Sequence, residues 1–168
     1  MGMIDSVLAE LDREAKTTET VFERIPDDKL SWKPHEKSMS LGQLALHIAN
    51  TPGAISAMAI PDTFEIKPNA FKERPVPANK AEVLETYRKG LATAKEALSK
   101  LNDTDLLATW QLTREGKPLM AVPRIGFLRS IMLNHSYHHR GQLSVYLRLL
   151  NVSVPSIYGP SADENPFG

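Results

Sequence analysis

Apolar residues recur at three- and four-residue spacing in four segments of this chain, which is the pattern of amphipathic helices. The first segment covers residues 4–25 and is followed by Pro26. The second begins at the capping-box sequence Ser40-Leu41-Gly42-Gln43 and reaches Ile55. Because proline lacks an amide donor and clashes with the preceding turn, Pro52 is expected to kink or end this second helix.

The other two segments lie in the second half of the chain. A third helix is expected over residues 79–101, where Asn79 and Glu82 offer an N-terminal cap. The fourth and longest is expected over residues 123–150, with Pro123 in its first turn. These four segments predict a bundle whose inward-facing side chains can build a site.

The connections between these helices are irregular or short. Residues 61–77 hold four prolines and no sustained period, which predicts a long irregular connection. Residues 109–113 and 118–122 favour a short β-hairpin between the third and fourth helices. Residues 152–168 are expected to lie across the surface. The sequence thus predicts an all-α four-helix bundle, with this hairpin, as a single domain over residues 1–168.

Histidines interrupt the apolar stripe of the fourth helix. His135 and His139 lie one turn apart on one helical face, so their imidazoles can converge on one metal ion. A buried imidazole with unsatisfied nitrogens costs roughly 1–3 kcal/mol for each group, and a metal ion removes that cost. His47, in the middle of the second helix, could supply a third nitrogen.

Spacing alone leaves other interpretations open. His138 also faces His135, at a spacing of three. It could be a ligand, a hydrogen-bond donor that contacts a ligand and not the metal, or a packed core residue. The histidines could equally be structural, satisfied by ordinary hydrogen bonds. Arg140 and Gln142 could orient a substrate anion or contact the metal ligands without touching the metal. Arg140 could instead pair with a carboxylate on a neighbouring helix.

Composition excludes several classes of function. Twenty basic and twenty acidic residues cancel, so nothing marks the chain as a nucleic-acid binder. It has no cysteine, which excludes thiolate catalysis by the chain itself and every cysteine-based zinc site. Ser136 follows His135 where the zinc-peptidase motif has glutamate, so that chemistry is unsupported.

The sequence also gives expectations for the cellular location and the oligomeric state of the protein. We see no signal peptide at the start of the chain, and no apolar run reaches the ~18 residues that a membrane span needs. A cytoplasmic protein without membrane contact is therefore expected. Bundles of this size often pair through an exposed apolar helix face, so a homodimer is also expected.

Several motifs together carry a family resemblance. The run His135-Ser136-Tyr137-His138-His139-Arg140-Gly141-Gln142-Leu143, together with Ser40 to Ala49, Trp32-Lys33-Pro34 and Pro155 to Gly159, resembles the DinB/YfiT-like family of metal-dependent enzymes. The resemblance covers nearly the whole chain, and it implies a four-helix bundle with a divalent metal ion, often nickel or zinc, on three histidines.

Carried over by position, the resemblance implies His47, His135 and His139 as the metal ligands, which selects His139 over His138. It implies a metal-dependent hydrolase or thiol S-transferase acting on a small molecule. A transferase would need an external low-molecular-weight thiol, because the chain has no cysteine. The alternative is a non-catalytic stress-response protein that binds a metal or a small molecule.

Overall fold

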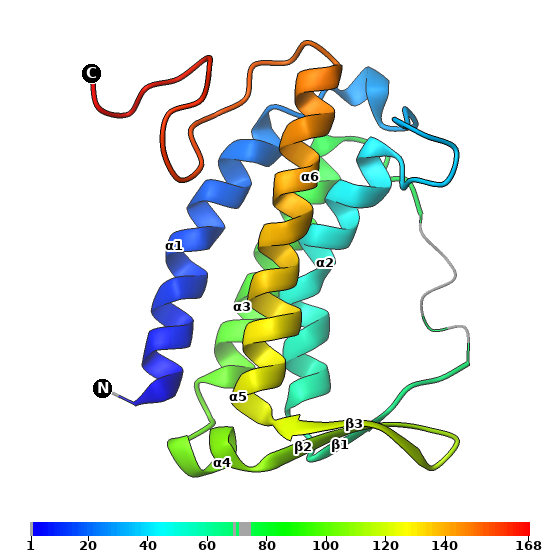
Figure 1. The fold of residues 1–168 in the computed structure, drawn as a ribbon, viewed down its shortest axis with the longest axis vertical. Helices are drawn as coiled ribbons and strands as arrows, with labels where there is room; N and C mark the ends of the chain where they lie inside the picture. The colour runs from blue at the N-terminus through cyan, green and yellow to red at the C-terminus, as the bar shows by residue number, and fades with distance from the viewer. Residues whose placement is uncertain (1, 69, 71–74) are drawn as a thin grey trace.

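The computed structural model describes residues 2–68, 70 and 75–168, and most of these residues are helical (Figure 1). The helices are α1 (Met3–Glu23), the 3-10 turn η1 (Asp27–Lys29), α2 (Leu41–Ala59), α3 (Lys80–Leu98), α4 (Asp103–Leu107), α5 (Arg124–Phe127), the π-helical segment η2 (Leu128–Asn134) and α6 (His135–Leu149). The strands are β1 (Thr63–Glu65), β2 (Thr109–Arg114) and β3 (Lys117–Pro123).

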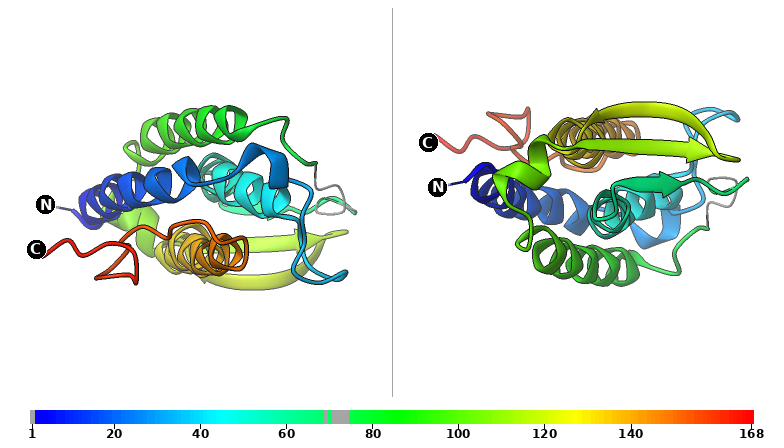
Figure 2. Two further views of the ribbon diagram at one scale, coloured as in Figure 1. Left: turned by 90° about the horizontal axis from the view of Figure 1, so that it is seen from above. Right: turned by 90° about the horizontal axis from the view of Figure 1, so that it is seen from below.

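The long helices α1, α2, α3 and α6 pack lengthwise, and the small sheet lies across one end of them (Figure 1). Seen along the helices, α1 and α2 lie between α3 on one side and α6 on the other (Figure 2). Their facing sides form one apolar core, to which every long helix contributes fully buried residues such as Phe22, Leu44, Leu98 and Leu143. Burial of these amphipathic stripes is the main stabilising contribution.

Side-chain caps define where three of the helices begin. Ser40 accepts a hydrogen bond from the Gln43 amide, and the Gln43 side chain accepts one from the Ser40 amide, as the sequence predicted. The Asn79 side chain accepts a hydrogen bond from the Glu82 amide and so caps α3. The third helix, expected to reach residue 101, ends at Leu98 as α3, and Asn102 caps the short helix α4.

Two glycines set the distance between α2 and α3. A Cβ atom added to Gly53 would lie 3.0 Å from the Gly90 Cα, and one added to Gly90 would lie 3.3 Å from the Ala49 carbonyl oxygen. The two backbones therefore approach more closely than side chains would allow. This contact holds α2 against α3, on the side of α2 away from α6 (Figure 2).

The sheet has the order β1-β2-β3, with β2 parallel to β1 and antiparallel to β3. The β2–β3 pair confirms the predicted hairpin. Buried Trp110 joins the hairpin to the helices, since its ring stacks 3.7 Å from that of Phe127 and its indole N–H donates to the Met58 carbonyl. Arg124, 2% exposed, donates to the Ala59 and Asp105 carbonyls and pairs with Asp62, joining α2, α4 and α5.

The expectation of an all-α four-helix bundle is correct only in its coarser part, a mostly helical fold. Strand β1 lies within residues 61–77, where an irregular connection was expected; three residues are too few to show a period-two pattern. Residues 69 and 71–74 of that connection lie outside the described part of the chain. The expected fourth helix is divided into α5, η2 and α6, because its hydrogen bonds change type over η2.

The segment after α6 lies along the outside of α1 and α6, as expected (Figure 1). Asp163 pairs with Arg148 of α6, and Glu164 pairs with Arg24, the residue that follows α1. Among the described residues, no helix is both long and apolar enough to cross a membrane.

Candidate metal centre

Three histidines from two helices come together at the α2–α6 contact. His47 projects from α2, while His135 and His139 project from successive turns of α6. One ring nitrogen from each residue lies within 4.8 Å of the other two, and all three residues are half-buried. The ring centroids are 4.3 to 5.1 Å apart, and each ring meets the others edge to face.

The spacing of these nitrogens fits a metal ion. His47 Nε2 lies 2.9 Å from His135 Nε2. Two imidazole nitrogens that each lie about 2.0–2.1 Å from one ion are roughly 2.9–3.4 Å apart, depending on the angle between them. Three neutral nitrogens also leave coordination positions for water or another ligand, which is typical of reactive metal sites.

A side-chain amide orients the third ligand candidate. The Oε1 atom of Gln142 lies 2.7 Å from Nδ1 of His139, one helical turn away along α6. An amide oxygen can only accept, so this contact places the ring proton on Nδ1 and the lone pair on Nε2. Gln142 thus favours the tautomer that offers Nε2 to a metal ion.

The π-helical segment η2 leads directly into His135. The amide of His135 donates to the carbonyl of Ser130, five residues earlier, so the wider hydrogen-bonding pattern ends at this histidine. Such π-turns occur often at functional sites, because they change which face of a helix the following residues occupy. The sequence prediction missed this feature. One signal was present: apolar and histidine positions recur every four residues, which is longer than the α-helical period of about 3.6 residues, at Phe127, Ile131, His135 and His139.

Helix α2 continues through Pro52, so the predicted end of the helix at this proline is wrong. It runs on to Ala59, with Pro52 buried inside it. Just before the proline, the hydroxyl of Thr51 donates to the His47 carbonyl over 2.8 Å, and the Asn50 amide donates to the Leu46 carbonyl over 2.9 Å. These side-chain donors give the Leu46 and His47 carbonyls an additional partner just before the proline.

The electrostatic environment favours the neutral form of His135. Burial lowers the pKa of His135 below its ordinary value of 6.5, and the neighbouring His139 and His138 lower this pKa further. Metal ligands must be neutral to offer a lone pair, so a lowered pKa favours the binding form at neutral pH. His135 is therefore favoured in the form that can donate a lone pair to a cation.

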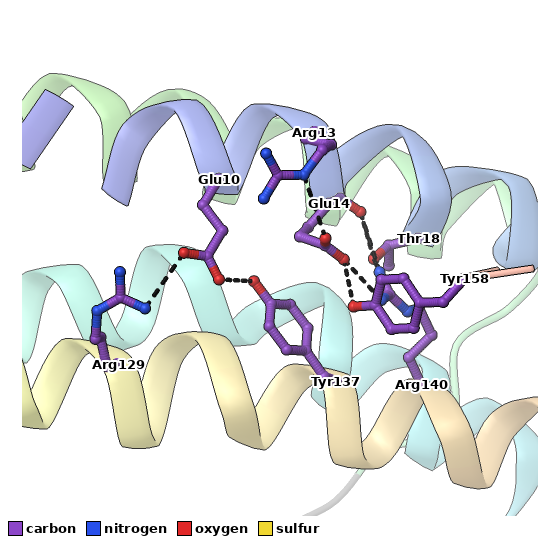
Figure 3. Close-up of polar contacts among 8 residues, drawn as sticks. All are labelled: Glu10, Arg13, Glu14, Thr18, Arg129, Tyr137, Arg140 and Tyr158. Carbon is purple, nitrogen blue, oxygen red and sulfur yellow. Dashed lines mark hydrogen bonds and ion pairs between the residues drawn. The ribbon is translucent and has the colours of Figure 1, made fainter. Parts of the chain in front are cut away.

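The remaining residues singled out in the sequence lie around this group. His138 is exposed and is not one of the three clustered histidines, but its ring lies 5.0 Å from that of His139. Arg140 is buried and directs its guanidinium group at Glu14 of α1 (Figure 3). The sequence had left open whether Arg140 meets a substrate or a helix carboxylate, and the structure places it against the carboxylate.

Comparison with known proteins shows the family of this chain. The family model described as the DinB family matches residues 2–165. The chain belongs to the DinB family. The uncharacterized protein YrdA of Bacillus subtilis is 27% identical over 161 residues, which cover 96% of this chain and 91% of YrdA.

Two solved structures have a similar fold. A DinB-like protein from Bacillus cereus superimposes with a TM-score of 0.69 at 29% identity, covering 90% of this chain and 95% of its own. The DinB-like protein YjoA of Bacillus subtilis does so with a TM-score of 0.68 at 20% identity, covering 90% and 97%. At that identity, YjoA supports the fold alone.

Proposed function

We propose that His47, His135 and His139 bind one divalent metal ion, with nickel or zinc expected, and that this DinB-family protein is a metal-dependent enzyme. The observation that carries the proposal is the convergence of one nitrogen from each histidine within 4.8 Å. The contact from Gln142 to His139 supports it, because metal-bound histidines usually donate their second ring N–H to a fixed acceptor.

The bound ion would act as a Lewis acid that lowers the pKa of a coordinated water or thiol to near neutrality. The chain's own residues hold the ion with three neutral nitrogens and leave positions open beside it. Because the chain has no cysteine, a thiol nucleophile must come from an external low-molecular-weight compound. The proposed reaction is hydrolysis of a small molecule or transfer of such a thiol to it, by a cytoplasmic protein expected to be a homodimer.

A second candidate is a stress-response protein that binds a metal or small molecule without turnover. One observation favours it: the clustered metal-binding side chains of the described residues are all histidines, with no carboxylate among them to serve as a general base. Assay of the metal-loaded protein with electrophiles and several thiols distinguishes the two candidates. Turnover that disappears in His47→Ala would reject the binding-only function.

Metal content tests the shared basis of both candidates. We expect about one ion per chain in the wild-type protein and strongly reduced metal in His47→Ala, His135→Ala and His139→Ala, because two imidazoles bind more weakly than three. His138→Ala is the matched control and should keep its ion. Full metal content in His139→Ala would show that the ligand set is wrong.

A further inference from the structure

A buried ionic cluster lies between α6 and α1 (Figure 3). Arg140 donates to Glu14 Oε2 over 2.7 Å and to Thr18 Oγ1 over 3.0 Å. The hydroxyl of Tyr158, from the segment after α6, donates to the same Glu14 oxygen over 2.7 Å and also accepts a hydrogen bond from Arg140. We call Glu14, Arg140 and Tyr158 the α1–α6 clamp.

Within the clamp, the ion pair of Glu14 and Arg140 is almost wholly removed from solvent. Arg140 is 1% exposed and Glu14 7% exposed, whereas Tyr158 is 70% exposed. Tyr158 contacts the pair with its hydroxyl group and with its ring, whose centroid lies 5.0 Å from the guanidinium carbon of Arg140. Within the described residues, no buried side-chain nitrogen or oxygen lacks a hydrogen-bond partner. Each group of the clamp is therefore held in one orientation by several partners.

Stability alone is a poor explanation for such a cluster. The desolvation of two buried charges offsets most of their attraction, and apolar side chains of similar size often stabilise a protein as well or better. A buried ion pair can instead specify one arrangement of the helices, because every alternative leaves a charge unpaired. Apolar side chains at the same positions would tolerate small rotations of α6.

The clamp lies next to a proposed metal ligand. Arg140 directly follows His139, and adjacent residues of an α-helix point about 100° apart around its axis. Fixing the Arg140 side chain against α1 therefore fixes the direction in which His139 leaves α6. One turn earlier, the Tyr137 hydroxyl donates to Glu10 of α1 over 3.0 Å, which holds the same face (Figure 3).

We propose that Glu14, Arg140 and Tyr158 are positioning residues for the metal centre, which set the rotation of α6 so that His139 meets His47 and His135. This role rests on the proposed metal site. It also makes the segment after α6 a functional part of the protein, because this segment supplies Tyr158. The clamp would control metal affinity and coordination without contacting the ion.

The double variant Glu14→Leu/Arg140→Met separates positioning from stability. It removes both charges together, leaves Thr18 bonded to the Glu14 backbone carbonyl, and frees Tyr158 to face solvent. We expect the thermal midpoint to be unchanged or higher, while the Kd for Co²⁺ rises about tenfold, as for other residues that orient metal ligands. The visible absorption of bound Co²⁺ should change as well. An unchanged Kd and spectrum would overturn the proposal.

Milder variants cover the outcome in which the double variant fails to fold. Tyr158→Phe should raise the Kd for Co²⁺ and alter its spectrum, whereas Leu91→Ala, buried on α3, should lower the midpoint without altering the spectrum. Equal effects of Tyr158→Phe and Leu91→Ala on the Kd and spectrum would reduce the clamp to a structural role. Failure of the wild-type protein to bind any divalent ion would instead reject the metal site itself, and the positioning role with it.

Discussion

Gln142 Oε1 accepts a hydrogen bond from Nδ1 of His139, one turn away on the same helix, over 2.7 Å. This contact orients the ring from behind. Replacement by Gln142→Leu should weaken metal binding by about tenfold, because the ring loses its fixed tautomer and direction. Gln142→Glu, which restores an acceptor, should retain the wild-type affinity or exceed it.

Isothermal titration of the metal-free protein with Zn²⁺ or Ni²⁺ measures both affinities. Val145→Ala, at an exposed position on α6, is the control for general effects on this helix. If Gln142→Leu binds as tightly as the wild-type protein, the amide has no role in orienting His139.

Glycine-to-alanine changes at Gly53 and Gly141 should have opposite effects on stability, because only Gly53 lies against another backbone. Gly53→Ala should destabilise the protein by about 1–3 kcal/mol, because its Cβ would lie 3.0 Å from the Gly90 backbone. Gly141→Ala should stabilise it by about 0.5–1 kcal/mol, since its Cβ would meet nothing within 4 Å and alanine favours helix. Urea unfolding of both variants measures this difference, and a loss of stability in Gly141→Ala would contradict it.

Replacing Arg124, which lies away from the candidate metal centre, should cause a large loss of stability. Arg124→Met should lower the free energy of unfolding by about 2–4 kcal/mol, because the buried Ala59 carbonyl and the half-buried Asp105 carbonyl lose their donor. Asp62→Asn should cost less than about 1 kcal/mol, since the Asp62 side chain is 85% exposed. Equal losses in the two variants would assign the stabilisation to the ion pair instead of the carbonyl contacts.

The contribution of Glu14 to the free energy of unfolding should depend on pH in the acid range. Burial alone would raise the pKa of Glu14, but the hydrogen bonds from Tyr158 and Arg140 and the charge of Arg140 outweigh it and lower the pKa below 4.5. A carboxyl group with a lowered folded-state pKa stabilises the protein above its unfolded pKa, and this stabilisation is lost as the pH falls through the folded value.

Denaturant unfolding between about pH 6 and about pH 3 tests this linkage. The wild-type free energy of unfolding should fall toward the acid end more steeply than that of Glu14→Gln, because the amide does not titrate. The two slopes would coincide if the carboxyl group of Glu14 had the same pKa in the folded and unfolded states.

The sequence predicted the long helices well, because local rules determine them. The apolar period marks the buried stripe of α1, and the caps at Ser40 and Asn79 depend on residues three positions away. The β2–β3 hairpin was predicted for the same reason, since two adjacent segments carry the pattern. By contrast, β1 pairs with Gln111–Thr113, which lie far from it in the sequence, and no local pattern predicts this pairing.

Within the candidate site, the sequence by itself determined the residue types and the shared face of His135 and His139, because both follow from one helical period. The placement of His47 against them required α2 and α6 to pack side by side, which the family resemblance implied and the spacing did not. The partner of Arg140 was decided only in the tertiary structure.

The π-turn before His135 and the insertion of Tyr158 into the clamp also depend on tertiary structure. Tyr158 and Glu14 are 144 positions apart in the sequence, so no pattern within either segment can predict their hydrogen bond. Local sequence thus determined which side chains α6 presents, while the packing of α1, α2 and the segment after α6 decided where those side chains point.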